Sequence, residues 1–341
     1  MLHIKQNYSL QNYNTFRVDI LAKQLITVEN ENDVLEVCKN DFLEPENYFI
    51  LGGGSNILFT NPEISTVIKN EIKGFEVLEK NDDTVVIRVG SGEDWHQTVL
   101  RCAESERYGL ENLALIPGTV GAAPVQNIGA YGVEAKDLIV EVEAIELFTG
   151  EKKVFSNEEC LFGYRSSIFK KVLKQRYFIT SVSFKLSLHK NLNLSYKGIT
   201  DEIAARGLTQ ANLRASQMVE IVSHIRKTKL PDHHTVGTAG SFFQNPIVSL
   251  AVRNKLEKSY PDMPRYPIDD STVKLSAGWL VEQAGFKGYF DHGVGTHKAH
   301  ALILIHDGSS TGKKIWEFAQ LIQQKVKDQF AVELVAEVNV L

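Results

Sequence analysis

The segment from Ile116 to Glu134 is the part of this 341-residue chain that most limits what it can fold into. It reads Ile-Pro-Gly-Thr-Val-Gly-Ala-Ala-Pro-Val-Gln-Asn-Ile-Gly-Ala-Tyr-Gly-Val-Glu, and it carries almost no charge. Glycine and proline interrupt helices, so this segment is not an ordinary helix. Its small residues allow the backbone to pack closely against something large and flat, and its amide groups can donate hydrogen bonds to that partner.

A second glycine-rich run, Gly52-Gly53-Gly54-Ser55-Asn56, follows the apolar residues Tyr48-Phe49-Ile50-Leu51. Successive backbone N–H groups in such a loop can cradle a pyrophosphate. The run differs from the dinucleotide motif G-x-G-x-x-G followed by a helix, because Ile57-Leu58-Phe59 continues in a strand-like pattern. Alone, the run fits a tight turn between strands. Together with the loop at 116–134, it favours a bound nucleotide cofactor.

Composition describes an ordinary soluble protein of about two domains, with 43% hydrophobic and 23% charged residues. The net charge of −5 disfavours broad nucleic-acid binding, which usually needs a basic face. Cys38, Cys102 and Cys160 form no Cys-x-x-Cys pair, so reduced thiols are expected. The first residues lack the apolar stretch of a signal peptide, and no run is long enough to span a membrane. A cytoplasmic protein is predicted.

Hydrophobic periodicity predicts a mixture of helices and strands. We expect helices at 31–40, 94–107, 211–229, 274–284 and 311–328, and strands at 84–89, 138–147, 176–186, 301–305 and 333–340. Pro231 follows the third helix, and a domain boundary is predicted near Lys229. Strands and helices without strict βαβ alternation favour an α+β fold.

Two further patterns suggest chemistry that we reject. Residues 308–314 imitate a phosphate-binding loop, but only three residues separate Gly308 from Gly312, so a turn followed by a helix N-cap is predicted. Several histidines invite a metal interpretation, but no cysteine or carboxylate cluster completes a site, and we predict no metal. These histidines are His233, His234, His297, His300 and His306.

Three residues remain ambiguous when they are considered alone. Arg165 beside Tyr164 suits a surface ion pair as well as a functional site, and Ser241 suits a turn cap as well as a reactive hydroxyl. Glu337 lies in an apolar segment, where a carboxylate without a partner is costly to bury. It therefore faces solvent or meets a partner in a site.

These segments together closely resemble the UDP-N-acetylenolpyruvoylglucosamine reductase family over nearly the whole chain. Each motif is weak singly, and their order and spacing make the set specific. The motifs are Asn14-Thr15-Phe16-Arg17, Leu51 to Asn56, Ile116 to Glu134, Gly163-Tyr164-Arg165-Ser166-Ser167, Ala239 to Pro246, Ala277-Gly278-Trp279-Leu280 and Ala336-Glu337-Val338.

The resemblance implies the vanillyl-alcohol-oxidase-type FAD-binding fold, an α+β architecture with two flavin-binding subdomains and a substrate-binding domain. Projected onto this chain, the flavin-binding subdomains span 1–70 and 71–229, and the substrate-binding domain spans 230–330. Residues 331–341 form a C-terminal strand that returns to the active site.

The resemblance also assigns roles to residues. The predicted pyrophosphate contacts are Gly53, Gly54, Ser55 and Asn56, and the predicted flavin contacts are Gly118, Thr119, Gly121, Ala122, Gln126 and Gly129. Arg165 matches the active-site arginine, Ser241 the proton-donating serine and Glu337 the catalytic glutamate. The predicted substrate-binding residues are Tyr196, Lys229, Asn245 and His300, where Tyr196 matches the loop tyrosine of the type I branch that closes over the substrate diphosphate.

The implied activity is the reduction of UDP-N-acetylglucosamine enolpyruvate to UDP-N-acetylmuramate, a step of peptidoglycan precursor synthesis. It uses non-covalent FAD and NADPH, and we expect a monomer with no metal, nucleic-acid or membrane partner. This chain departs from the family pattern at His300, where some relatives carry glutamine, and at Thr238, where asparagine is usual. The alternatives are another FAD-dependent oxidoreductase of the same fold and a non-catalytic nucleotide-sugar or flavin binding protein.

Overall fold

The computed structural model of the chain describes residues 2–40, 42–43 and 47–341. The chain forms two compact units that alternate along the sequence. The first unit comprises Met1–Tyr8, Leu21–Gly53 and Glu63–Thr228. The second unit comprises Ser9–Ile20, Gly54–Pro62 and Lys229–Leu341. The expected flavin-binding subdomains at 1–70 and 71–229 stay a prediction, and residues 9–20 and 54–62 of the first of them belong to the second unit.

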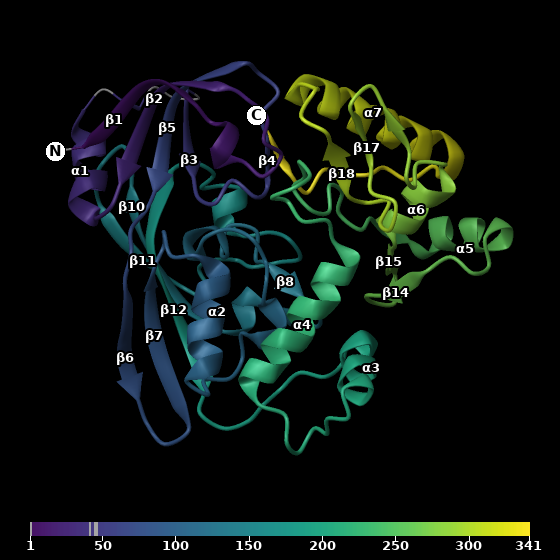
Figure 1. The fold of residues 1–341 in the computed structure, drawn as a ribbon, viewed down its shortest axis with the longest axis horizontal. Helices are drawn as coiled ribbons and strands as arrows, with labels where there is room; N and C mark the ends of the chain where they lie inside the picture. Colours follow the sequence, from purple (N-terminus) through teal and green to yellow (C-terminus); the bar gives the residue numbers. More distant parts are fainter. Residues whose placement is uncertain (1, 41, 44–46) are drawn as a thin grey trace. The chain divides into compact units, whose positions relative to one another are not determined.

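One sheet of the first unit has four strands in the order β1-β2-β5-β3 (Figure 1). Strands β2, β5 and β3 run parallel, and the register places Leu25, Val67 and Phe49 side by side. All three side chains are buried, as expected for a parallel sheet. The elements are β1 (His3–Ser9), β2 (Leu21–Val28), α1 (Glu31–Lys39), β3 (Tyr48–Leu51) and β5 (Glu63–Asn70).

The larger sheet of the first unit is antiparallel, with five strands in the order β11-β10-β12-β7-β6. Its apolar face forms one core with α2 and α4: Trp95 of α2 packs edge-on against Phe184 of β12, and Met218 of α4 is fully buried in the same cluster. The elements are β6 (Phe75–Lys80), β7 (Thr84–Gly90), α2 (Trp95–Glu104), β8 (Gly129–Ala130), β9 (Val133–Glu134), β10 (Ile139–Glu146), β11 (Lys152–Ser156), β12 (Tyr177–Ser187), α3 (Lys197–Ala205) and α4 (Ala215–Lys229).

The second unit carries two three-stranded sheets, β13-β15-β14 and β16-β17-β18, and a parallel pair β19-β4. Strand β4 comes from the N-terminal part of the chain, whereas β19 ends it. The elements are β4 (Ile57–Leu58), β13 (Ile247–Ser249), α5 (Leu250–Ser259), β14 (Arg265–Pro267), β15 (Thr272–Leu275), α6 (Ala277–Gln283), β16 (Phe290–Asp291), β17 (Val294–Thr296), β18 (Leu304–His306), α7 (Gly312–Phe330) and β19 (Asn339–Val340).

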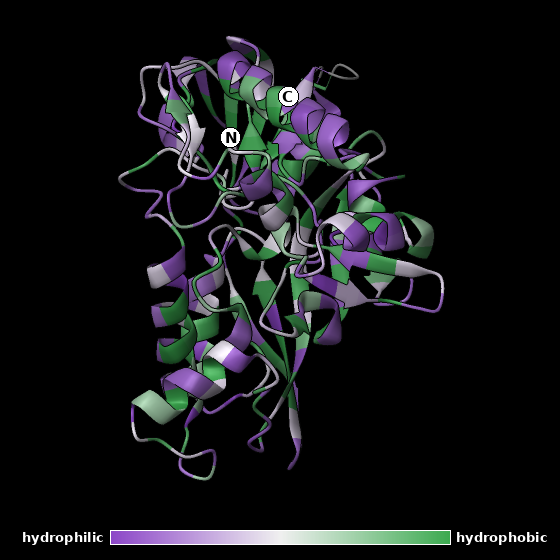
Figure 2. Ribbon diagram, turned by 90° about the vertical axis from the view of Figure 1, so that its right-hand side faces the viewer, coloured by the Kyte–Doolittle hydropathy of each residue, from purple (hydrophilic) through white to green (hydrophobic). Residues whose placement is uncertain are grey.

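Hydropathy follows the architecture, because apolar residues concentrate on the strands while polar residues cover the outer faces of the helices (Figure 2). Among the helices that the structure describes, none has both the length and the apolar character to cross a membrane.

Most predicted elements are confirmed to within a few residues, and three need correction. The strand expected at 301–305 begins only at Leu304, as β18 (Leu304–His306), because residues 301–303 form a turn and an isolated bridge. The helix expected at 274–284 starts later, because residues up to Leu275 belong to β15 and the Ser276 side chain accepts a hydrogen bond from Trp279 N and caps α6. The strand expected at 333–340 is reduced to β19 and one isolated bridge between Ala336 and Phe243. At 308–314 the turn and N-cap are confirmed, since Thr311 accepts from Lys314 N at the start of α7.

Candidate functional site

The two glycine-rich loops meet within the first unit. A Cβ atom on Gly53 would lie 2.6 Å from Gly118 Cα, and one on Gly52 would lie 2.7 Å from Thr119 Oγ1. At Gly53 the two backbones therefore approach so closely that a Cβ atom does not fit without a backbone shift. Packing between the loops is enough to explain Gly53, and its contact with a cofactor stays a prediction.

Thr119 gives the clearest sign that a polar ligand belongs beside these loops. Its Oγ1 is buried, and among the residues that the structure describes it has no hydrogen-bond partner. A buried hydroxyl without a partner is costly, and a ligand oxygen or nitrogen would remove that cost. Gly121 continues the same surface, since its N–H donates to Ser91 O at 2.8 Å and a Cβ there would meet Ser91. The residues present thus fit a nucleotide cofactor.

Arg165 sits in a tight turn with a positive φ of 51°. Gly163 and Ser166 close this turn by reciprocal backbone hydrogen bonds of 2.9 and 3.2 Å. Strands β8 and β9 pair antiparallel into a separate two-stranded hairpin. The Arg165 Nη2 atom donates to Gly129 O at 2.9 Å, which fixes the guanidinium against this hairpin, β8–β9. A non-glycine residue with positive φ is uncommon and is a reason to look for function at that position.

Two further hydrogen bonds attach this turn to the 123–130 loop. Ser167 Oγ donates to Val125 O at 2.6 Å, and Asn127 Nδ2 donates to Gly163 O at 3.1 Å. Both Ser167 and Asn127 are buried, so water competes little for these bonds. The turn that carries Arg165 and the glycine-rich loop therefore form one connected structure.

A second cation lies near the first. Burial lowers the pKa of Arg226, Tyr131 opposes that shift by charge and a hydrogen bond, and the repulsion from Arg165 lowers the pKa further. The Tyr131 ring also packs edge-on against Tyr196, with ring centroids 4.8 Å apart. Arg165, Arg226 and Tyr196 thus all lie beside the hairpin β8–β9 in the first unit. Sequence analysis did not single out Arg226 as a functional residue.

In the second unit, the backbone brings the segments of Ser241 and Glu337 together. Phe242 O accepts from Glu337 N at 2.8 Å, and Gln244 N donates to Val335 O at 2.9 Å. Asn56 Nδ2 donates to Glu337 O at 3.3 Å. Thus Glu337 is paired with the residue that follows Ser241, and the glycine-rich run supplies a neighbour from the distant N-terminal region.

The predicted substrate-binding residues of the second unit surround the first turn of α6. Asn245 Oδ1 accepts from Ala277 N at 2.9 Å, and a Cβ atom on Gly278 would touch the His300 ring at 3.7 Å. Burial lowers the pKa of His300, and the charge of Lys229 acts in the same direction, so a neutral imidazole is favoured. Lys229, Asn245 and His300 are therefore neighbours.

The chain is similar in sequence to known protein families and to named enzymes. Residues 231–341 match the UDP-N-acetylenolpyruvoylglucosamine reductase C-terminal domain, and residues 22–154 match an FAD binding domain. A UDP-N-acetylenolpyruvoylglucosamine reductase of Flavobacterium johnsoniae is 42% identical over 341 residues, covering 100% of both chains. One of Shewanella sediminis is 43% identical over 340 residues, covering 100% of this chain and 97% of its own. The chain belongs to the UDP-N-acetylenolpyruvoylglucosamine reductase family.

The fold agrees with that membership. The crystal structure of UDP-N-acetylenolpyruvylglucosamine reductase from Thermus caldophilus matches with a TM-score of 0.67 at 23% identity, covering 100% of this chain and 98% of the other. The expected vanillyl-alcohol-oxidase-type architecture and the expected family are therefore confirmed. The roles that the resemblance assigns to individual residues stay predictions.

Thr238, which stands where asparagine is usual in the family, forms local hydrogen bonds before Ser241. Its N–H donates to Thr15 O at 3.0 Å, and its Oγ1 accepts from Gly240 N at 3.2 Å. Threonine thereby holds the turn before Ser241 through a local side-chain-to-backbone bond, which is also the way asparagine commonly acts in turns.

Proposed function

We propose that this chain is the FAD-dependent, NADPH-using enzyme that reduces UDP-N-acetylglucosamine enolpyruvate to UDP-N-acetylmuramate. The observation that carries the proposal is the 42% sequence identity to the UDP-N-acetylenolpyruvoylglucosamine reductase of Flavobacterium johnsoniae. This similarity extends over the full length of both chains. The buried Thr119 hydroxyl without a partner in the described residues and the close-packed glycine loops support FAD as the cofactor.

Flavin chemistry supplies a hydride relay from NADPH to the terminal vinyl carbon of the substrate. In this proposal, Thr119, Gly121 and the rest of the 118–129 loop hold the ring, and the Gly53–Asn56 segment holds the pyrophosphate. Neither loop contains a histidine or a cysteine, so these loops offer no covalent attachment of the types seen in some flavoproteins.

Arg165 stabilises the charge that develops on the substrate. Hydride addition to the vinyl carbon pushes negative charge toward the neighbouring carbon and its carboxylate. A guanidinium already fixed by Gly129 O needs little reorganisation to meet that charge. Arg226 of α4 adds a second positive charge near Arg165, which suits a substrate with a carboxylate and a diphosphate.

Ser241 delivers the proton that completes the reduction, and Glu337 assists at the substrate carboxylate. A serine hydroxyl is a weak acid, so it suits only a strongly basic, carbanion-like carbon. Glu337 lies one backbone pair away from Ser241, at Phe242. Lys229, Asn245 and His300 bind the nucleotide-sugar part, and Tyr196 covers the diphosphate.

The test is optical. The purified protein should be yellow, should bleach with NADPH without oxygen, and should regain its colour when UDP-N-acetylglucosamine enolpyruvate is added. Colour that returns only with oxygen would instead support an oxidase of the same fold. A protein that binds flavin and never bleaches would support a binding protein without turnover.

We further infer a cytoplasmic monomer. Peptidoglycan precursors of this kind are charged nucleotide sugars, and their enzymes meet them in water. Sedimentation at micromolar concentration should give the 38.2 kDa mass of one chain.

A further inference from the structure

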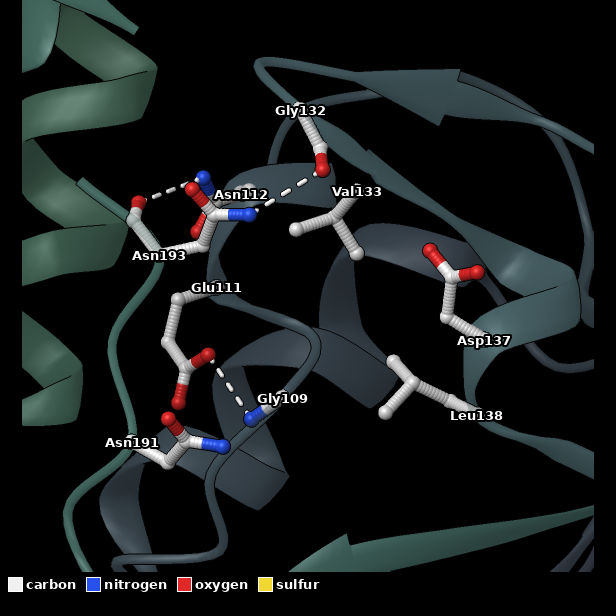
Figure 3. A pocket seen from close by; sticks show the side chains of 9 residues that line it. All are labelled: Gly109, Glu111, Asn112, Gly132, Val133, Asp137, Leu138, Asn191 and Asn193. Carbon is white, nitrogen blue, oxygen red and sulfur yellow. Dashed lines mark hydrogen bonds between the residues drawn. The ribbon is translucent and has the colours of Figure 1, made fainter. Parts of the chain in front are cut away.

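The short segment from Asn191 to Tyr196 lies against the tip of hairpin β8–β9, and side-chain amides join the two (Figure 3). Asn193 makes most of these links. Its Nδ2 donates to Gly132 O at 3.0 Å, while its Oδ1 accepts from Ser195 N at 3.0 Å and from Ser195 Oγ at 2.6 Å. One side chain thus holds both the hairpin tip and the residue before Tyr196.

Asn112 links the same two elements from the core side. Its side chain is 1% exposed, and its Nδ2 donates to Tyr131 O and to Asn193 O, each at 2.9 Å. Because both donor hydrogens have acceptors, the amide orientation is defined by its partners. Removing one of these partners would leave a buried polar group unpaired.

The hairpin tip is shaped for this contact. Tyr131 and Gly132 both have positive φ, of 51° and 84°. A Cβ atom on Gly132 would lie 2.6 Å from Ser195 Oγ, so glycine permits the approach of the segment. The Tyr131 ring meets the Tyr196 ring edge-on, so Tyr196 rests on the same tip.

A half-open pocket lies beside the segment. It has a volume of about 380 Å³ and is lined by Gly109, Glu111, Asn112, Gly132, Val133, Asp137, Leu138, Asn191 and Asn193. Leu192 and Leu194 of the segment are partly buried and pack against the core of the first unit. Apolar packing therefore anchors the segment, and the hydrogen bonds of Asn193 and Asn112 fix how its exposed end, Ser195 and Tyr196, meets the hairpin tip.

We propose that Asn193, supported by Asn112, is a positioning residue that holds Tyr196 ready over the substrate diphosphate. The inference rests on the proposed function, in which Tyr196 contacts that diphosphate. It adds two residues for which the family motifs predict no role.

The test compares Asn193→Asp with Asn191→Asp. The first variant keeps the acceptor for Ser195 and removes the donor to Gly132 O, whereas the second places the same charge two residues away on an exposed side chain. We expect Asn193→Asp to raise KM for the enolpyruvyl sugar about tenfold, as for the loss of one or two hydrogen bonds. Flavin reduction by NADPH should stay within about twofold of the wild type in both variants.

A double-mutant cycle separates positioning from general damage. In a Tyr196→Ala background, Asn193→Asp should no longer raise KM, because the residue it positions is absent. If Asn193→Asp loses its flavin, Asn193→Ala takes its place in the cycle.

An unchanged KM in the single variant, or an equal rise with and without Tyr196, overturns the positioning role alone. A wild type whose reduced flavin is not reoxidised by the substrate refutes the proposed function and the positioning role with it.

Discussion

Arg165 illustrates how a single residue is prepared for charge stabilisation. Its guanidinium is bound to Gly129 O, its backbone adopts a positive φ, and Arg226 lies close enough to repel it. The positive φ and the repulsion from Arg226 each cost free energy in the folded chain, and an anionic ligand would offset the repulsion. Such costs are typical of residues selected for function instead of stability.

Ser241 offers the sharpest test of chemistry at the residue scale. Ser241→Ala removes one hydroxyl from a half-buried position and should leave flavin reduction by NADPH unchanged. Loss of a general acid should slow the substrate half-reaction by about 10²–10⁴-fold. Stopped-flow absorbance of the two half-reactions measures both effects. If the two rates stay at wild-type values, Ser241 has no part in proton transfer.

Glu111 should make stability depend on pH. Burial raises the pKa of this 2% exposed carboxyl to about 7, and Glu106 adds to the rise. The folded state therefore keeps a proton that the unfolded state releases near pH 4.5, so this contribution to stability is present below pH 4.5 and is lost as pH rises through 7.

Glu111→Gln keeps an acceptor for Gly109 N and removes the titration. Relative to wild type, the variant should gain up to about 3 kcal/mol in free energy of unfolding between pH 4.5 and 8. Urea unfolding at several pH values measures this gain, and Glu104→Gln on the exposed face of α2 is the control. A difference that does not change with pH would contradict the buried, titrating carboxyl.

At the scale of elements, the long amphipathic segments were predictable and the short contacts were not. Apolar spacing located α1, α2, α4 and α7 within a few residues, because each buries one face over several turns. The prediction for 333–340 was wrong, since Leu334 and Val338 are buried from irregular backbone, Val335 is exposed, and only Asn339–Val340 enters a ladder.

For the site, too, one part could be predicted from the sequence and another could not. Motif order predicts which residues belong to it, but their meeting depends on contacts between distant positions. Asn193 and Gly132 are 61 residues apart, and no periodicity in the sequence relates them. The sequence indicates only that a turn is favoured just before Tyr196. In Asn193-Leu194-Ser195, the Asn and Ser side chains are of the types that hydrogen-bond to the nearby backbone in turns.

The contact between the glycine loops predicts the effect of Gly53→Ala. Because the added Cβ would fall 2.6 Å from Gly118 Cα, the two backbones must separate. We expect a loss of about 1–3 kcal/mol in free energy of unfolding and a smaller fraction of purified protein that carries flavin. Gly278→Ala is the matched control, because its Cβ would make only ordinary contacts of 3.7–3.9 Å. Equal stability and flavin content in the two variants would contradict the tight approach.

At the scale of the whole molecule, the alternation of the two units along the chain has a consequence for folding. The second unit takes Ser9–Ile20 and Gly54–Pro62 from the N-terminal part of the sequence. Phe16, which is fully buried, packs edge-on against Phe242, and its carbonyl is hydrogen-bonded by His306. Strand β4 is the partner of β19.

A fragment of residues 229–341 should therefore not form a stable fold with a cooperative unfolding transition, although residues 231–341 match a family domain by themselves. Without Phe16 it loses a large core side chain, which alone costs about 3–5 kcal/mol, and without β4 the final strand has no partner. Such losses approach the whole stability of a small domain.

Circular dichroism during heating of the fragment should show a broad, shallow change. A control fragment in which flexible linkers add residues 9–20 and 54–62 should regain a sharp transition. A sharp transition in the short fragment would mean that residues 229–341 fold without residues 9–20 and 54–62, which would contradict this prediction.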